Sequence, residues 1–243
     1  MKTRFFLSLL CAAACLLSGC SLTSRLGTEE QSLLSASSLN KGDLVAFGSF
    51  EQDGDTKDGA EPLCWMVLEV LEDRALLLCR DVLAAMPFHD TYEEITWEDC
   101  SLRAFLNGPF ADGTFTEQER ERILTVSNQN PSNPGMESHG CGVTRDQVFL
   151  LSLEEASASM RTEEAHYVIG AADATRYAQI LHLETDGERD ENPGKACWWT
   201  RTSGSDQYAA AFVDRDGRLY PAGAQVTHET YCGIRPAVWV SMK

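Results

Sequence analysis

The stretch from Cys197 to Trp239 constrains the fold more than any other part of the chain. It reads CWWTRT, then the alternating run YAAAFV, a DRDG turn, RLYPAG and finally GIRPAVW. Asp216-Gly217 is a strong signal for a hairpin turn, because glycine readily adopts the positive φ that such turns require. We therefore expect an antiparallel hairpin followed by a last strand. Pro236 predicts that this last strand lies at an edge or carries a bulge, because proline has no N–H to donate.

The middle of the chain predicts a further hairpin and several short helices. Two apolar runs, residues 63–71 and 75–83, flank a short polar turn, which is typical of a β-hairpin with both faces covered. Helix starts are predicted at Thr96, Thr116 and Ser152, because each is followed three residues later by a carboxylate that completes a capping box.

Other segments are less regular. A fourth helix is predicted from Ala174. Residues 127–142 (SNQNPSNPGMESHGCG) have the composition of an exposed loop.

The N-terminus predicts export. Lys2 and Arg4 precede an apolar run from Phe5 to Leu17, which is too short to span a bilayer and has the layout of a secretion signal. The following Leu17-Ser18-Gly19-Cys20 resembles the lipobox of bacterial lipoproteins. This resemblance implies that the Cys20 sulfur receives a diacylglycerol group, whose two acyl chains give stable anchoring. The alternative is an ordinary signal peptide with a chance cysteine.

Three regions follow from this assignment. Residues 1–19 are a signal peptide, residues 20–40 are the lipidated Cys20 and a flexible Ser-rich tether, and residues 41–243 are a single domain. The expected location is the cell membrane, with the domain lipid-anchored and facing the outside of the cytoplasm.

The charge of the chain excludes one class of partner. Removal of residues 1–19 leaves 18 basic and 37 acidic residues, a net charge of −19. A chain this acidic is repelled by phosphate backbones, so nucleic-acid binding is excluded.

Six cysteines remain in the mature chain after Cys20, which permits disulfides in an exported domain. None has zinc-site spacing, and several lie in apolar runs where cysteine packs as a small hydrophobe. The pairing that we predict is Cys197 with Cys232, since each opens a strand near the same C-terminal sheet.

The run D-G-D-T-K-D-G at residues 53–59 suggests calcium, but Lys57 holds a ligand position and Cys64 stands where a glutamate is expected. A plain Asp/Gly turn is favoured, with calcium as the alternative. No metal and no cofactor is predicted.

An ordered set of motifs identifies a family. FGSFEQDGD, P-x-x-W-x-V-L, TWEDCSLRAFLN, VFLLS-x-x-E-A, WW-x-R-T and GIRPAVW resemble the motifs of bacterial surface domains of unknown function. The C-terminal part of that family looks like the C-type-lectin-like fold shared with formylglycine-generating (sulfatase-modifying) enzymes. The resemblance implies an α+β domain, with short helices around a twisted antiparallel sheet. Thr200 and Thr202 depart from the family, which usually has Leu and Ser there.

We expect a non-catalytic domain that binds a glycan or a protein at the cell envelope. Aromatic side chains and arginines stack on sugars or peptides and carry interface energy. The candidate ligand-binding residues are Trp198, Trp199, Arg201, Tyr208, Tyr220 and Arg235. The alternatives are core packing for the tryptophans and ion pairs for the arginines.

Two other functions stay open at this point. The first is a thiol/copper oxidase like the formylglycine-generating enzymes, which would use Cys197 and Cys232. The second is a purely structural surface module. Hydrolase motifs such as G-x-S-x-G and H-E-x-x-H do not occur in the chain, and neither do the EPN and QPD strings of sugar-binding C-type lectins.

Overall fold

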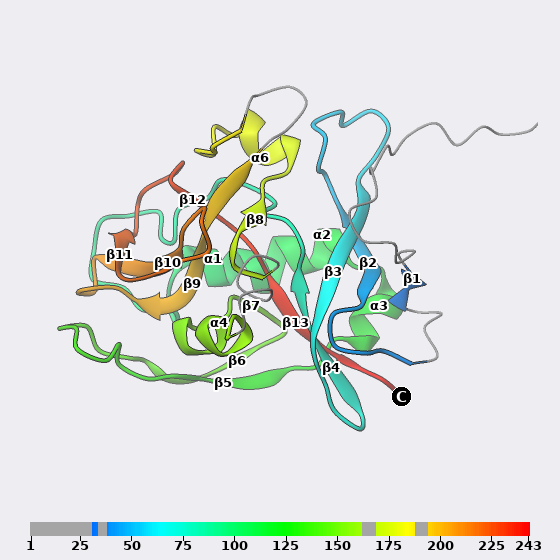
Figure 1. Ribbon diagram of the computed structural model, residues 1–243, viewed down its shortest axis with the longest axis horizontal. Helices are drawn as coiled ribbons and strands as arrows, with labels where there is room; N and C mark the ends of the chain where they lie inside the picture. Colours follow the sequence, from blue (N-terminus) through cyan, green and yellow to red (C-terminus); the bar gives the residue numbers. More distant parts are fainter. Residues whose placement is uncertain (1–30, 34–37, 162–168, 188–193) are drawn as a thin grey trace, which may run out of the picture.

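Figure 1 shows the computed structural model, which describes residues 31–33, 38–161, 169–187 and 194–243. The predicted signal peptide and Cys20 lie outside the described residues. Within the described residues, none of the helices combines the length and the apolar character needed to cross a membrane.

The first sheet has six strands and joins the two ends of the domain. Its last strand in sequence lies between two strands from the middle of the chain, so segments far apart in sequence are hydrogen-bonded there (Figure 1). All pairings are antiparallel except the first, which is parallel. In spatial order the strands are β1 (Gln31–Ser32), β2 (Leu44–Phe50), β3 (Glu61–Val70), β4 (Arg74–Cys79), β13 (Ala237–Ser241) and β7 (Val148–Phe149).

The position of β13 corrects the expectation drawn from Pro236. β13 is not an edge strand, because β4 and β7 flank it. Pro236 lies just before the strand, where its missing N–H is not needed, and its carbonyl accepts a hydrogen bond of 2.8 Å from the Cys79 N–H.

The second sheet is built by the C-terminal stretch. The predicted hairpin is confirmed, and Gly217 in its turn has φ 80°. The strands in spatial order are β11 (Leu219–Gln225), β10 (Ala209–Val213), β9 (Lys195–Ser203) and β12 (Cys232–Gly233), and β8 (Ala172–Asp173) also pairs with β9.

Short helices surround the sheets, so the α+β class is confirmed. They are α1 (Ser101–Phe105), η2 (Leu106–Phe110), α2 (Ala111–Thr114), α3 (Glu117–Arg122), α4 (Leu153–Ser159) and α6 (Arg176–Ile180). Both capping residues Thr116 and Ser152 form complete capping boxes, at α3 and α4. α6 confirms the helix predicted from Ala174.

The helix start predicted at Thr96 is wrong. α1 begins five residues later, with the Cys100 thiol accepting the capping hydrogen bond from the Arg103 N–H at 3.4 Å. The intervening Trp97 explains the delay. Its indole is buried, and its Nε1 donates to Asp146 at 3.3 Å, which holds this segment against the core as a turn.

The loop predicted over residues 127–142 is confirmed for residues 131–141, but its two ends belong to the strands of a hairpin. β5 (Val126–Asn130) pairs with β6 (Gly142–Asp146). The inward side chains of this hairpin are polar. The Asp146 carboxylate accepts hydrogen bonds from Asn128 at 2.9 Å and from Thr144 at 2.7 Å. Because apolar and polar residues do not alternate in β5 and β6, the sequence did not predict these two strands.

The packed domain begins earlier than the predicted boundary at residue 41. β1 pairs with β2, and Leu33 and Leu39 are buried in the core. The flexible tether predicted over residues 20–40 is therefore too long at its C-terminal end, because these two leucines gain free energy by leaving water.

Candidate functional site

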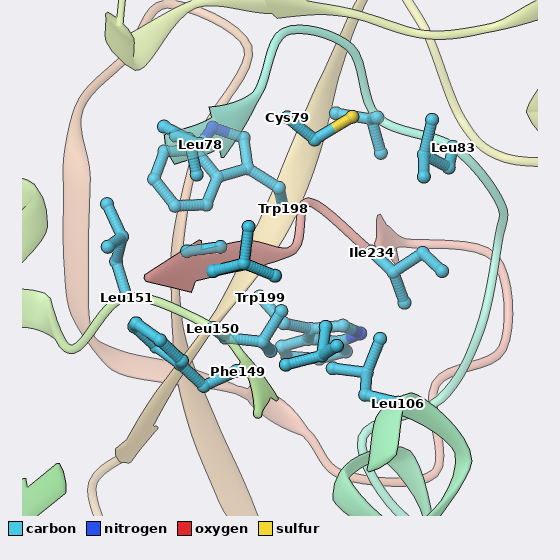
Figure 2. Packing of buried hydrophobic residues seen from close by; sticks show 14 of the residues in the cluster. Leu78, Cys79, Leu83, Leu106, Phe149, Leu150, Leu151, Trp198, Trp199 and Ile234 are labelled. Atoms are coloured by element: carbon cyan, nitrogen blue, oxygen red, sulfur yellow. The ribbon is translucent and has the colours of Figure 1, made fainter. Parts of the chain in front are cut away.

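The structure places Trp198 and Trp199 in the interior. Both are 0 % exposed, and Figure 2 shows them within the apolar cluster on β9. Each indole N–H is satisfied by a backbone carbonyl at 2.8 Å, that of Gly170 for Trp198 and that of Met86 for Trp199. Both faces of β9 are covered, so these two side chains stabilise the core and do not reach a ligand at the surface.

Arg235 is also a core residue. Its guanidinium donates to the carbonyls of Cys79 at 2.9 Å, Arg80 at 3.0 Å and Ile169, and it lies over the Trp198 ring, 5.0 Å from the centroid. Burial lowers the pKa of Arg235 to about 10. The side chain joins three chain segments, and its complete burial keeps it from a ligand at the surface.

Arg201 is buried but lies beside a cleft. Its guanidinium forms a two-pronged ion pair with Glu155 and donates to the Leu150 carbonyl at 2.8 Å and to Asn130 Oδ1 at 3.0 Å. Glu155 also completes the capping box of α4. Arg201 therefore ties β9 to β5 and to the start of α4.

Tyr208 and Tyr220 are the two predicted binding residues with substantial access to solvent. Tyr220 is 43 % exposed and stacks on Phe212, with ring centroids 4.9 Å apart and planes 8° apart. Tyr208 packs against the exposed Tyr92, also at 4.9 Å. The two tyrosines belong to separate aromatic pairs, and neither lines the cleft next to Arg201.

We call this cleft the β5 cleft. It has a cavity volume of about 550 Å³. Its lining residues are Arg74, Thr125, Val126, Ser127, Asn128, Gln129, Ser152, Glu154, Glu155, Arg201 and Trp239. Four parts of the fold meet there, namely β5, the start of α4, the β4–β13 pair and, through Arg201, β9. These elements are labelled in Figure 1.

The wall from the first sheet is built by Arg74 and Trp239. Arg74 pairs in register with Ser241, two residues from Trp239, so both side chains lie on the same face of the β4–β13 pair. The Arg74 guanidinium lies 4.8 Å from the centroid of the half-buried Trp239 ring. The Leu124 N–H donates to the Trp239 carbonyl at 2.8 Å, which holds the start of β5 against this wall.

The β5 cleft is electrically balanced in a strongly acidic chain. Two arginines, Arg74 and Arg201, face two glutamates, Glu154 and Glu155, whereas the whole chain carries a net charge of −17. Of the six residues predicted to bind a ligand, Arg201 lines this cleft. Trp239 lines the cleft but was not among the predicted binding residues. The sequence could have pointed to it, because it is the third tryptophan of the C-terminal stretch.

The predicted neighbours Cys197 and Cys232 lie side by side. They are register partners on the parallel strands β9 and β12, and both are buried thiols. The disulfide between them stays a prediction. Burial raises the pKa of Cys79 and of Cys100 to about 12. Cys100 caps α1.

The Asp/Gly-rich segment forms a turn. The carboxylates of Glu51, Asp53 and Glu61 lie within 4.8 Å of one another. Each accepts a backbone N–H from the same segment, at 2.6 Å from Gly54, 2.7 Å from Asp55 and 2.6 Å from Gln52 respectively. These hydrogen bonds are those of a plain polar turn, the favoured interpretation of this run.

Comparison with known proteins gives a family and no activity. No curated protein and no solved structure shows significant similarity to the chain. The profile of the domain of unknown function DUF6273 matches residues 72–242, which is most of the chain and includes β4, β13 and the whole second sheet. The chain therefore belongs to the DUF6273 family.

Proposed function

We propose that this protein is a lipid-anchored, extracytoplasmic binding protein whose domain recognises a glycan of the cell envelope through the β5 cleft. The observation that carries the proposal is the composition of the cleft. It combines one aromatic ring with hydroxyl, amide, carboxylate and guanidinium groups from four parts of the fold. Ligand sites are typically concave and place a few polar groups around an apolar surface.

The polar groups suit a polyhydroxylated ligand. Ser127, Gln129 and Glu154 are exposed at the cleft and offer both donors and acceptors. The half-buried Trp239 ring, which lies beside Arg74, provides the aromatic surface of the cleft. Because the arginines and glutamates of the cleft balance, the cleft has no net charge that would favour a charged ligand over a neutral sugar.

The proposed location of the protein depends on its N-terminal sequence. Its positive start, its apolar run and the lipobox-like ending at Cys20 support export and lipidation. Mass spectrometry of the mature N-terminus from cells, with Cys20→Ser as the control, tests this part separately. An unmodified Cys20 in the mature protein would contradict the proposed lipid anchor.

The finer fold assignment is also part of the proposal. A C-type-lectin-like domain is supported by the antiparallel strands β9, β10 and β11 with short helices nearby. Superposition of a crystal structure on C-type-lectin-like domains tests it, and a different strand order overturns it.

Binding to purified cell-wall polysaccharide tests the function. The mature chain is mixed with the insoluble polymer and the bound fraction is measured by sedimentation. Gln129→Ala and Glu154→Gln are expected to reduce the bound fraction at least several-fold, because each removes hydrogen-bonding capacity at the cleft. Gln147→Ala and Glu117→Gln are the matched controls, since both residues are exposed and lie outside the cleft.

The outcomes separate the functions. Binding that the cleft variants do not weaken overturns the β5 cleft as the site. Capture of an envelope protein in place of the polysaccharide makes the ligand a protein. Binding to neither favours a purely structural surface module.

A second candidate is a thiol/copper oxidase of the formylglycine-generating type. The observation in its favour is the contact between the Cys197 and Cys232 thiols, because Cu(I) prefers thiolate ligands. Cu(I) titration of the wild-type chain and of Cys197→Ser tests it. Equal copper binding by both proteins rules it out.

A further inference from the structure

Cys197 and Cys232 are placed as the two halves of a cross-strand disulfide. They are direct register partners on the parallel strands β9 and β12, and the next pair is Trp198 with Gly233. Neighbouring strands lie about 4.8 Å apart, and disulfides join Cα atoms about 4.4–6.8 Å apart. Partner side chains leave a sheet on the same face, and here the two thiols are hydrogen-bonded to each other.

The two thiols are not equivalent. The hydrogen bond from Cys232 lowers the pKa of Cys197, and the positive charge of Arg215 lowers it further. Burial raises the pKa of Cys232 well above its ordinary value, and the hydrogen bond to Cys197 adds to this shift. Since the thiolate is the nucleophile in thiol–disulfide exchange, these shifts favour Cys197 over Cys232 as the attacking thiol.

Four ionisable side chains act on the pair. Arg215 and Asp214 come from the turn between β10 and β11, Glu184 from the segment after α6, and Tyr231 directly precedes Cys232. Arg215 is the one cation among them. Its Nε is buried without a hydrogen-bond partner among the described residues, and its Nη2 lies 3.4 Å from Glu184.

Both thiols are buried, so a reaction with an external disulfide requires a local opening of the structure around β12. β12 has only two residues and ends the strand order of its sheet, and its other side is held by a bridge from Gly233 to Ala85 and by the Ile234 N–H, which donates to the Ala84 carbonyl at 3.0 Å. The half-buried Tyr231 and the partly exposed Arg215 lie next to the pair. Native proteins undergo local openings of this kind without global unfolding.

We propose that Cys197 and Cys232 are a thiol–disulfide exchange site, in which Cys197 attacks an external disulfide and Cys232 resolves the resulting mixed disulfide. The inference is independent of the β5 cleft. Arg215 is a positioning residue that favours the Cys197 thiolate.

The exchange balances without a metal or other cofactor. The Cys197 sulfur bonds to one sulfur of the external disulfide, whose S–S bond breaks and whose other half leaves as a thiolate and takes up the proton released by Cys197. Cys232 then loses its proton and attacks the Cys197 sulfur, and the second half of the oxidant leaves as a thiol. Two protein thiols are oxidised and one external disulfide is reduced to two thiols.

Oxidised glutathione tests the pairing in the full chain. After reduction and removal of the reductant, the chain is incubated with the oxidant, and non-reduced peptides are mapped by mass spectrometry. The expected product is a linked pair of peptides containing Cys197 and Cys232, with the loss of two hydrogen atoms. A link between Cys100 and Cys141, whose charges also interact, or no link at all overturns the proposal.

Single variants test the order of attack. Cys232→Ser is expected to accumulate a stable glutathione adduct on Cys197, because the resolving thiol is missing. Cys197→Ser is expected to leave Cys232 unmodified over the same time. Equal adducts on both variants overturn the assigned roles. Cys79, buried with a raised pKa, is the internal reference for thiols that do not react in the folded chain.

The rate of adduct formation in the Cys232→Ser background tests Arg215. Arg215→Gln is expected to slow the reaction several-fold at neutral pH and to shift its pH profile upward, and Arg215→Lys is expected to restore most of the rate. Arg218→Gln is the matched control, since Arg218 is exposed on the same hairpin and pairs with Asp216. An unchanged pH profile in Arg215→Gln rules out the positioning role.

Discussion

Arg201 on β9 and Glu155 on α4 form a two-pronged ion pair in which the arginine side chain is 2 % exposed and the glutamate side chain 41 % exposed. Arg201 also donates to the carbonyls of Leu150 and Gln129 and to Asn130 Oδ1. The pair thus fixes one wall of the β5 cleft and holds three segments together.

Removal of Arg201 is expected to destabilise the domain strongly. Arg201→Met leaves the acceptors on Glu155, Leu150 and Asn130 without their donor, and breaking such a pair costs about 3–5 kcal/mol when both ions are buried. Because Glu155 is partly exposed, we expect about 2–3 kcal/mol in the free energy of unfolding. Urea denaturation measures it.

Arg218→Met is the control for this prediction. Arg218 is 69 % exposed and pairs with the exposed Asp216, so its loss is expected to change the free energy of unfolding by less than about 0.5 kcal/mol. Equal effects of the two substitutions would contradict the structural role of Arg201.

The helix starts give a second prediction. Thr116→Ala and Ser152→Ala each remove a capping hydroxyl that accepts an N–H from the third residue of its helix. Each substitution is expected to lower the free energy of unfolding by about 1 kcal/mol. Thr96→Ala is expected to have a smaller effect, because α1 is capped by Cys100. A larger loss at Thr96 than at Thr116 would show that the sequence pattern, and not the structure, marks the true cap.

The sequence predicted those elements whose pattern is local and apolar. The hairpin of β3 and β4 and that of β10 and β11 each combine apolar runs with a polar turn, and both are present. The hairpin of β5 and β6 was missed because Asn128, Asn130, Thr144 and Asp146 point inward and satisfy one another by hydrogen bonds. Such a polar interior has no signature in hydrophobic periodicity.

The site was harder to predict than the fold. Trp198 and Trp199 were predicted to bind a ligand, with core packing as the alternative, and their complete burial shows that they pack in the core. The sequence does not show that both faces of β9 are covered. The β5 cleft depends on tertiary packing, since Arg74, Gln129, Glu154 and Trp239 come from four separate segments. The neighbouring cysteines were predicted because each opens a strand of one sheet.

A third prediction concerns Gly223 on β11. Its φ is 77°, and a Cβ placed there would lie 2.3 Å from the Ala210 carbonyl oxygen on β10. Gly223→Ala therefore forces the two strands apart.

Gly59 is the control, because it also has a positive φ, 97°, but has nothing within 4 Å of the added carbon. Thermal unfolding is expected to show a cost of about 1 kcal/mol for Gly59→Ala and a larger cost for Gly223→Ala. Equal costs would mean that β10 and β11 are not packed as described.

The fourth prediction is a pH dependence at Glu93. Its carboxylate accepts hydrogen bonds from the Thr91 hydroxyl at 2.6 Å and from His89 Nε2 at 2.9 Å, and these partners lower the pKa of Glu93. A carboxyl whose pKa is lower in the folded state contributes stability above its unfolded pKa, and this contribution disappears as the pH falls through the folded value. At pH values below the ordinary pKa of glutamate, Glu93→Gln should therefore reduce the slope of the free energy of unfolding against pH. Near neutral pH, its free energy of unfolding should fall slightly.

Glu94→Gln is the control on the adjacent exposed residue. Chemical denaturation across the acid range measures both variants, and an unchanged slope in Glu93→Gln would show that these hydrogen bonds do not form in solution.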